Sequence, residues 1–393
     1  MDPPQSHHEL HRDSYAMTDL ESIHFEAKQT TGPEFYNRNS LSRRIGLAGV
    51  GVAALFGICC ICVGVVSSSL PGLAGIISIR SSWEKELFSL ALNLMVTACT
   101  EAIGFTHGIA LRSALASERR LHFNTNLRLL SAANGVFNLN GTLCNVVMAI
   151  LLVISYSSSL LLTLSLDASG GDELAIGVSK VPLIVMGVAL LLQATFAYAS
   201  VWSADILTWS SSPFDITAAL VHHAQIHPEL GRCMHGVAND KQQGPVKPSA
   251  KQLSAWGAHQ SVRKVVLTLW LLVFFCVVWG VIIVCLANRM WPTAGRWTFL
   301  PQAQSDPVTY PVAVLEGIYY LWPIYYLNMA AIQGPLTLAL HCSELIVNLV
   351  RDERTWRKAT TEKGMTISSH PLGFVFGSPL NVALLVSKPL LRK

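Results

Sequence analysis

The chain has 393 residues, of which 51% are hydrophobic and 13% are charged, whereas an average soluble protein carries roughly 25% charged residues. With a mean hydropathy of +0.42, it has too few polar residues to cover a soluble domain, which excludes a soluble enzyme and a disordered regulator. A formal net charge of +4 is too small for the basic footprint of a nucleic-acid-binding protein. The composition therefore predicts an integral membrane protein with several spans.

The N-terminal segment, residues 1–44, is polar and lacks the apolar core of a secretory signal. We expect it to form a disordered cytosolic tail. The first apolar stretch begins at Ile45 and is long, so we expect it to remain as a membrane span rather than to be cleaved.

Six stretches after this tail are long and apolar enough to cross a bilayer, which takes about 20 residues of helix. Four of them carry no charge, whereas the second contains Glu101 and the last contains Glu316. The predicted spans are residues 45–66, 88–110, 142–165, 181–201, 265–287 and 312–333. The sequence thus predicts an all-α fold, a bundle of six transmembrane helices within residues 45–350.

The distribution of basic residues predicts which loops face the cytosol, because cytosolic loops are enriched in lysine and arginine. Of the 28 such residues, 23 lie in the N-terminal tail, in the loops after the second and fourth spans, and in the C-terminal tail. This asymmetry predicts that both termini are cytosolic. It does not identify the membrane.

Two predicted cytosolic regions are long enough to bind a protein partner. Residues 203–264 form a polar loop, and residues 351–393 form a tail that begins with a charged run. Within this tail, residues 371–391 are apolar but broken by prolines and glycines, so we expect them to lie in the membrane interface. A seventh membrane segment is the alternative.

The second span contains the first of three polar stripes. An acid in the middle of a span is costly and usually faces the bundle interior or a water path. Helical spacing places Glu101 on one face with small and polar residues, namely Asn93, Thr97, Thr100, Gly104 and Gly108. This pattern indicates either a proton or cation site or a seam where helices pack closely.

A second polar stripe begins at the end of the last span and continues beyond Gly334 and Pro335. It consists of Gln333, Thr337, His341, Glu344 and Asn348, opposite an apolar face. We therefore expect a cytosolic amphipathic extension of the last span. His341 and Glu344 could form a hydrogen-bonded pair or bind a metal. The alternative is the wet face of an interfacial helix.

The third stripe, Asn134, Asn138, Gly141 and Asn145, is predicted at the start of the third span. Asparagines in membranes usually form hydrogen bonds between helices. If the three stripes meet, they form one polar interior, which is the main sequence argument for a transport path.

The long polar loop contains candidate metal ligands, and one glycosylation sequon precedes the third span. The candidate ligands are His222, His223, His227, Cys233 and His235. Their spacing matches no standard zinc pattern, so a solvated histidine-rich segment is the alternative. The sequon at Asn140 lies at the predicted cytosolic edge of the span, and we expect it to be unmodified.

Four distinctive motifs are found at residues 107–112 (HGIALR), 120–128 (RLHFNTNLR), 254–259 (SAWGAH) and 334–345 (GPLTLALHCSEL, followed by RDE at 351–353). In these motifs the chain resembles a family of uncharacterised polytopic membrane proteins from fungi. The resemblance implies a multi-pass membrane protein and supplies no activity, catalytic residue or cofactor.

Three functions remain open from the sequence. The first is a transporter or channel for an ion or small polar solute, with Glu101, Asn138, Asn145 and Glu316 along the path. The second is a membrane sensor or scaffold that binds a cytosolic protein through residues 203–264 and the C-terminal tail. The third, ranked last, is a membrane-embedded enzyme using His341 with Glu344 or the loop histidines. The expected partners are the lipid bilayer, a small ion or solute and a cytosolic protein, without nucleic acid.

Overall fold

The structure is a computed structural model of the chain. It describes residues 40–67, 73–79, 82–118, 120–121, 131–167, 174–210, 212–222, 226–227, 235–236, 256, 260–290, 322–359, 361, 363 and 378–391. The predicted tail up to residue 39 and the candidate Glu316 therefore lie outside the described residues.

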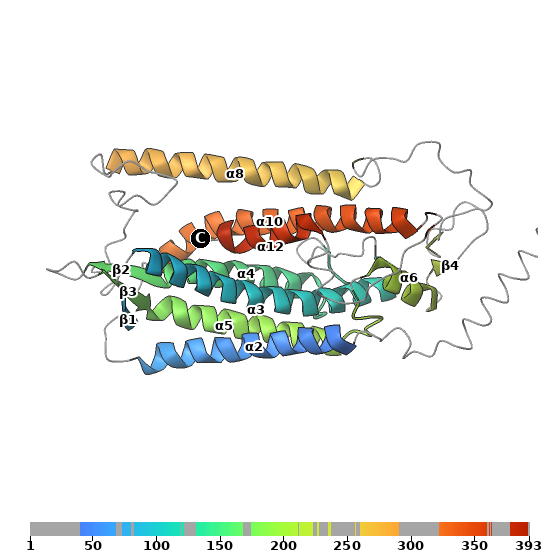
Figure 1. The fold of residues 1–393 in the computed structure, drawn as a ribbon, viewed down its shortest axis with the longest axis horizontal. Helices are drawn as coiled ribbons and strands as arrows, with labels where there is room; N and C mark the ends of the chain where they lie inside the picture. Colours follow the sequence, from blue (N-terminus) through green and yellow to red (C-terminus); the bar gives the residue numbers. More distant parts are fainter. Residues whose placement is uncertain are drawn as a thin grey trace, which may run out of the picture. The chain divides into compact units, whose positions relative to one another are not determined.

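Helices dominate the described residues (Figure 1). The helices are α2 (Ser40–Val66), α3 (Ser82–Ser117), α4 (Thr142–Leu161), α5 (Lys180–Trp202), α6 (Pro213–His222), α8 (Gln260–Met290), α10 (Trp322–Ala359) and α12 (Pro379–Leu391). The strands are β1 (Leu73–Ile79), β2 (Thr163–Asp167), β3 (Leu174–Ser179), β4 (Ile226–His227) and β5 (His235–Gly236).

Six of the described helices are long and apolar enough to cross a membrane, which confirms the predicted all-α bundle of six transmembrane helices. The candidate spans are Leu41–Val66, Glu86–Ser117, Thr142–Leu161, Lys180–Trp202, Val262–Ile282 and Tyr325–Ala359. They indicate an integral, multi-pass membrane protein in contact with lipid.

Two of these helices differ in extent from the predicted spans. The third span was expected to reach residue 165, but α4 ends at Leu161 and the chain continues as β2. The sixth was expected at residues 312–333; residues 312–321 lie outside the described residues, and α10 (Trp322–Ala359) continues far beyond residue 333. Pro335 lies inside α10 without ending it, as prolines in membrane helices commonly do.

The main core is formed where α2, α3, α4 and α5 pack together, and it includes Ala53, Ile103, Met186 and Leu190. Small residues allow α2 and α5 to approach closely. A methyl group at Gly187 of α5 would lie 2.5 Å from the carbonyl oxygen of Gly57 in α2. This contact is the close helix approach that glycine permits in membrane bundles.

A three-stranded antiparallel sheet joins the α2–α3 and α4–α5 connections, with strand order β1-β3-β2. Ile77 pairs with Ile176 on one side of β3, and Ser165 pairs with Ile176 on the other. The sheet satisfies the backbone hydrogen bonds of these connections and ties four spans together at one end.

The last helices pack around α10, which contacts α4, α8 and α12. Val265 of α8 packs against Cys342 and Leu345 of α10, while many large apolar side chains of α8 remain exposed, as on a lipid-facing helix. The short helix α12 contacts both α10 and α3. It lies alongside the middle of α10 and runs back along it (Figure 1).

By its contacts the chain divides into two units. One comprises Arg44–Ile206 and Pro248–Lys393, and it contains all the helix contacts described above. The other comprises Met1–Arg43 and Leu207–Lys247, with α6 and the short antiparallel pair of β4 and β5.

Candidate functional site: a charged cluster inside the bundle

Glu101 lies at the centre of a candidate span. It stands midway along Glu86–Ser117, so about 23 Å of helix separates it from either end at 1.5 Å per residue. Its side chain is 30% exposed in the protein alone. The acid that the sequence singled out therefore lies at the depth where charge is most costly, and it needs a partner there.

Glu344 lies on α10, seven residues before the charged run that begins at Arg351, and therefore towards the charged end of the candidate span Tyr325–Ala359. His341, one helical turn earlier, places Nδ1 3.5 Å from the Glu344 carboxylate. The predicted pairing of His341 with Glu344 is thus present. The polar stripe that contains them lies on the part of α10 that continues beyond Pro335, where a helical extension of the last span was predicted.

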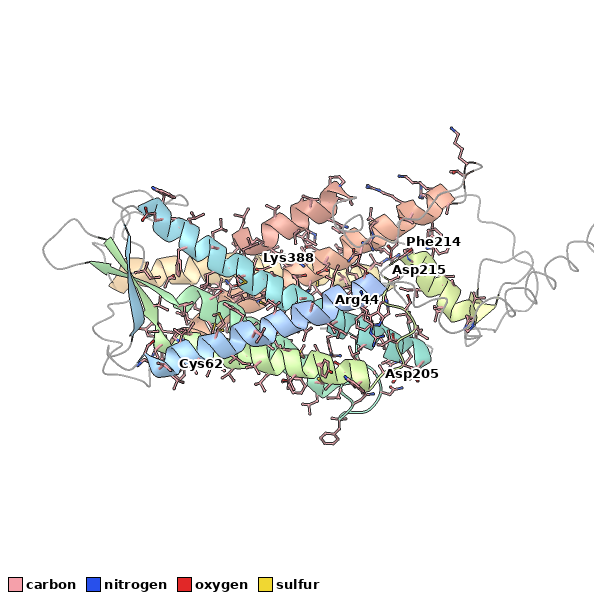
Figure 2. All side chains as sticks on the ribbon, turned by 60° about the horizontal axis from the view of Figure 1, so that its bottom comes forward. Arg44, Cys62, Asp205, Phe214, Asp215 and Lys388 are labelled. Carbon is pink, nitrogen blue, oxygen red and sulfur yellow. The ribbon has the colours of Figure 1, made fainter. Side chains whose placement is uncertain are left out.

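Lys388 of α12 joins the two acids. Its Nζ lies 2.8 Å from Glu101 Oε1 and 3.1 Å from Glu344 Oε2, and its side chain is only 4% exposed. Figure 2 labels Lys388 among the helices of the bundle. Three helices that are distant in sequence, α3, α10 and α12, therefore meet through one ammonium group, and we call Glu101, Glu344, His341 and Lys388 the charged cluster.

The sequence analysis missed Lys388 because it placed residues 371–391 in the membrane interface. In the structure, residues 379–391 form a helix that packs against α3 and α10, while residues 371–377 lie outside the described residues. One signal was present in the sequence. Lys388 is the only charged residue within a helix otherwise rich in leucine and valine.

The electrostatics of the charged cluster depend on Lys388. Two carboxylates face one ammonium, so the cluster has an excess of one negative charge when His341 is neutral. Ion pairs are stronger in an environment of low dielectric constant, and a buried charge that loses its partner is costly. Loss of Lys388 would therefore leave Glu101 and Glu344 without a cation, and loss of both acids would leave the buried Lys388 ammonium unpaired.

The stripe on α3 divides between two neighbours. Thr100 Oγ1 lies 2.6 Å from the Tyr156 hydroxyl of α4, whereas Glu101 contacts α12. Asn93 is buried, and its Nδ2 has no hydrogen-bond partner among the described residues. One side of the stripe thus forms a seam between helices, and the other reaches the charged cluster.

The stripe on α10 is also largely buried. Gln333 and Thr337 are buried, and Gln333 Oε1 and Thr337 Oγ1 have no hydrogen-bond partner in the described part of the chain. Nearer the start of α10, the Tyr326 hydroxyl lies 3.0 Å from Ser158 Oγ of α4. Polar contacts thus connect α10 to α4 as well as to α12.

The third predicted stripe is wrong as a helical stripe, because α4 begins only at Thr142. Asn138 lies in the preceding turn, where its Nδ2 donates to the Asn134 carbonyl and its Oδ1 accepts from the Asn140 amide. Asn145, in the first turn of α4, donates to the Ser131 carbonyl. Asn134 and Asn138 thus organise a turn by local hydrogen bonds, as asparagine commonly does, whereas Asn145 ties the start of α4 to the segment before it.

Asn140 is buried beside the end of α5. Its Nδ2 lies 3.4 Å from the Ser200 carbonyl and 3.3 Å from Ser203 Oγ. A side-chain amide held in this way is not available to a glycosyltransferase, which adds a second reason to expect an unmodified sequon.

The loop histidines are described only in part. The register of β4 and β5 pairs His227 with His235, and His222 ends α6. His223 and Cys233 lie outside the described residues. No group of three or more His, Cys, Asp or Glu that could hold a metal ion occurs among the residues whose structure is described.

The chain matches no known protein-family model, no curated protein and no solved structure.

Proposed function

We propose that the protein transports an ion or small polar solute across its membrane and that the charged cluster lies on the path. The observation that carries this proposal is the ion pairing of Glu101, at the middle of a candidate span, and of Glu344 on α10 with the buried Lys388. Packing alone does not require charges at this depth, where each costs about 2.5–3.5 kcal/mol on insertion scales. Charged groups within spans are most often found in substrate, ion or proton pathways.

Unpaired polar atoms on the same helices support this proposal. Asn93 Nδ2 on α3 and the side-chain oxygens of Gln333 and Thr337 on α10 are buried without a hydrogen-bond partner in the described chain. Buried polar groups are normally hydrogen-bonded, so each of these atoms has capacity for a solvent molecule or a solute. By the same criterion Asn145 Oδ1 in α4 also has no hydrogen-bond partner in the described chain, whereas the side-chain amide and oxygen of Asn138 are both satisfied within its turn.

Flux measurements on reconstituted vesicles test the proposal. A panel of monovalent cations, protons and small polar solutes is offered to vesicles that contain the wild-type chain or Glu101→Gln. We expect flux of one solute class, and we expect Glu101→Gln to reduce it at least tenfold. The matched control is Glu353→Gln on α10, which removes a carboxylate from an exposed pair with Arg357 and should leave flux unchanged. Wild-type flux in Glu101→Gln would contradict the proposal.

A sensor or scaffold remains the alternative, and one observation favours it. Lys388 is paired with both acids, so the charged cluster could serve only to dock α12 within the bundle. In that case Glu101→Gln lowers stability without changing any flux. The partner surface would then lie in residues 203–264 and the C-terminal tail. A pull-down with the full chain, compared with a chain lacking the polar part of that loop, would test this alternative.

A further inference from the structure

Helix α12 is too short to be a span. Its 13 residues extend about 20 Å, against a hydrocarbon thickness of about 30 Å. It runs back along α10 (Figure 1), and Lys388, near its C-terminal end, meets Glu101 at the middle of one candidate span and Glu344 on α10. The helix therefore enters the bundle from the end where α10 finishes and stops partway across.

The distribution of side chains on α12, apolar outwards and charged inwards, is the reverse of that on a helix lying on a membrane surface. Leu380, Val386 and Leu390 are exposed, while Lys388 is buried against α3 and α10. A lysine on an interfacial helix would direct its ammonium towards water. Apolar side chains facing outwards and a cation facing inwards are the arrangement expected in lipid.

The two carboxylates that receive this ammonium come from separate helices. Within the described chain, Lys388 is the only lysine or arginine paired with Glu101 or Glu344, and Glu344 has His341 as a further neighbour. If α12 left the bundle, both acids would lose this countercharge and would need a proton or another cation in its place.

We infer that the position of the Lys388 ammonium, between Glu101 and Glu344, is a binding site for a primary ammonium group and that α12 occupies it from within the chain. Building on the proposed function, this names an organic primary amine as the solute class. A primary ammonium carries three N–H donors, which suit acceptors approaching from two helices, whereas a quaternary ammonium offers none. Hard divalent ions need more oxygen ligands than two carboxylates supply.

Docking of α12 and binding of an external amine are then competing events. An amine that binds the two carboxylates displaces Lys388, and removal of the Lys388 side chain opens the site to an amine of matching size. Lys388→Ala removes three methylenes and the ammonium, the same chemical group as propylammonium.

The experiment is chemical rescue of Lys388→Ala in the full chain. We expect Lys388→Ala to lower the melting temperature by several degrees and to speed hydrogen exchange in residues 379–391. Propylammonium should restore at least half of the lost melting temperature, with a saturable dependence on concentration. Propyltrimethylammonium and propanol should not. The matched variant is Lys388→Met, whose side chain fills the space without a charge, and propylammonium should not rescue it.

Absence of rescue, or equal rescue of Lys388→Met or by propyltrimethylammonium, would overturn the inference. If Lys388→Ala does not fold, the wild-type chain is titrated with propylammonium. Exchange in residues 379–391 should then rise at least twofold, and unchanged exchange would overturn the inference. Flux is a separate measurement: rescue combined with unchanged flux in Glu101→Gln would uphold the ammonium site and reject the transport proposal.

Discussion

The geometry of the charged cluster predicts which of its residues contributes most to the free energy of unfolding. Two carboxylates share one ammonium, so Glu101→Gln leaves Lys388 paired with Glu344 and removes the excess negative charge. Lys388→Met instead leaves two carboxylates near each other without their cation. We therefore expect Lys388→Met to be clearly more destabilising than Glu101→Gln, although both remove the same ion pair.

The magnitude follows from the distances. At an effective dielectric constant of about 20, unit charges 2.8 Å apart attract by roughly 6 kcal/mol, and desolvation offsets much of this. Breaking a buried pair by removing one partner typically costs about 3–5 kcal/mol, which we expect for Lys388→Met. For Glu101→Gln we expect about 1 kcal/mol, because a hydrogen-bonding amide replaces a surplus carboxylate. The coupling energy between the two sites should be about 2 kcal/mol.

A double-mutant cycle on the full chain in lipid nanodiscs measures these values, with unfolding followed by thermal or denaturant titration. The matched control is the exposed pair of Glu353 and Arg357, whose atoms lie 2.7 Å apart in an i,i+4 arrangement on α10. Its coupling should be only about 0.3–0.5 kcal/mol. Equal destabilisation by Glu101→Gln and Lys388→Met would contradict the prediction. So would a coupling energy no larger than that of the exposed control.

Two further predictions concern the surrounding bundle. Gly187→Ala should destabilise the chain by about 1–3 kcal/mol in an unfolding assay, because a methyl group there would meet the Gly57 carbonyl oxygen at 2.5 Å. Gly51→Ala on α2, which has open space around it, is the control and should leave the free energy of unfolding unchanged. Equal effects of the two substitutions would show that the contact is not tight. Asn140 should carry no glycan when the chain is expressed in a eukaryotic cell, so endoglycosidase should not change its mobility on a gel. Asn140→Ala should lower stability by about 1 kcal/mol through lost bonds to Ser200 and Ser203, and unchanged stability would contradict this role.

The helices were predictable because each is marked by a long run of apolar residues. About 20 consecutive apolar residues are hard to mistake, and each of the six regions contains a long helix among the described residues. Their ends were less predictable. Residues 163–165 are apolar and extend the hydropathy of α4, but they form β2 because β3 pairs with them. β2 and β3 form a local hairpin, but residues 163–165 were predicted as the end of a span; the pairing of β1 with β3 joins distant connections and leaves no local pattern.

The polar stripes show where periodicity succeeds and where it misleads. On α3 and α10 the helix exists, so spacing correctly placed Thr100 and Glu344 towards neighbouring helices. Before α4 the same spacing occurs in a turn, and Asn138 bonds to its own loop. Spacing of three and four residues has meaning only where the backbone is helical, and asparagines, which favour turns, are the least reliable evidence for that.

The buried position of Lys388 could not be predicted from its own segment, because it depends on partners in two other helices. In a short apolar helix, a lone lysine is equally consistent with an interfacial position and with a buried ion pair, and only its partner decides between them. Glu101 indicated a missing cation, since an acid at mid-span needs a countercharge or a proton, whereas Glu344 was predicted in the cytosolic extension of the last span and gave no such indication. Counting Lys388 with the cytosolic cations concealed this match. Reassigning it leaves the remaining basic residues as unevenly distributed as before, so the prediction of which loops are cytosolic does not depend on Lys388. The pairing of intramembrane charges becomes a separate constraint on how the helices assemble.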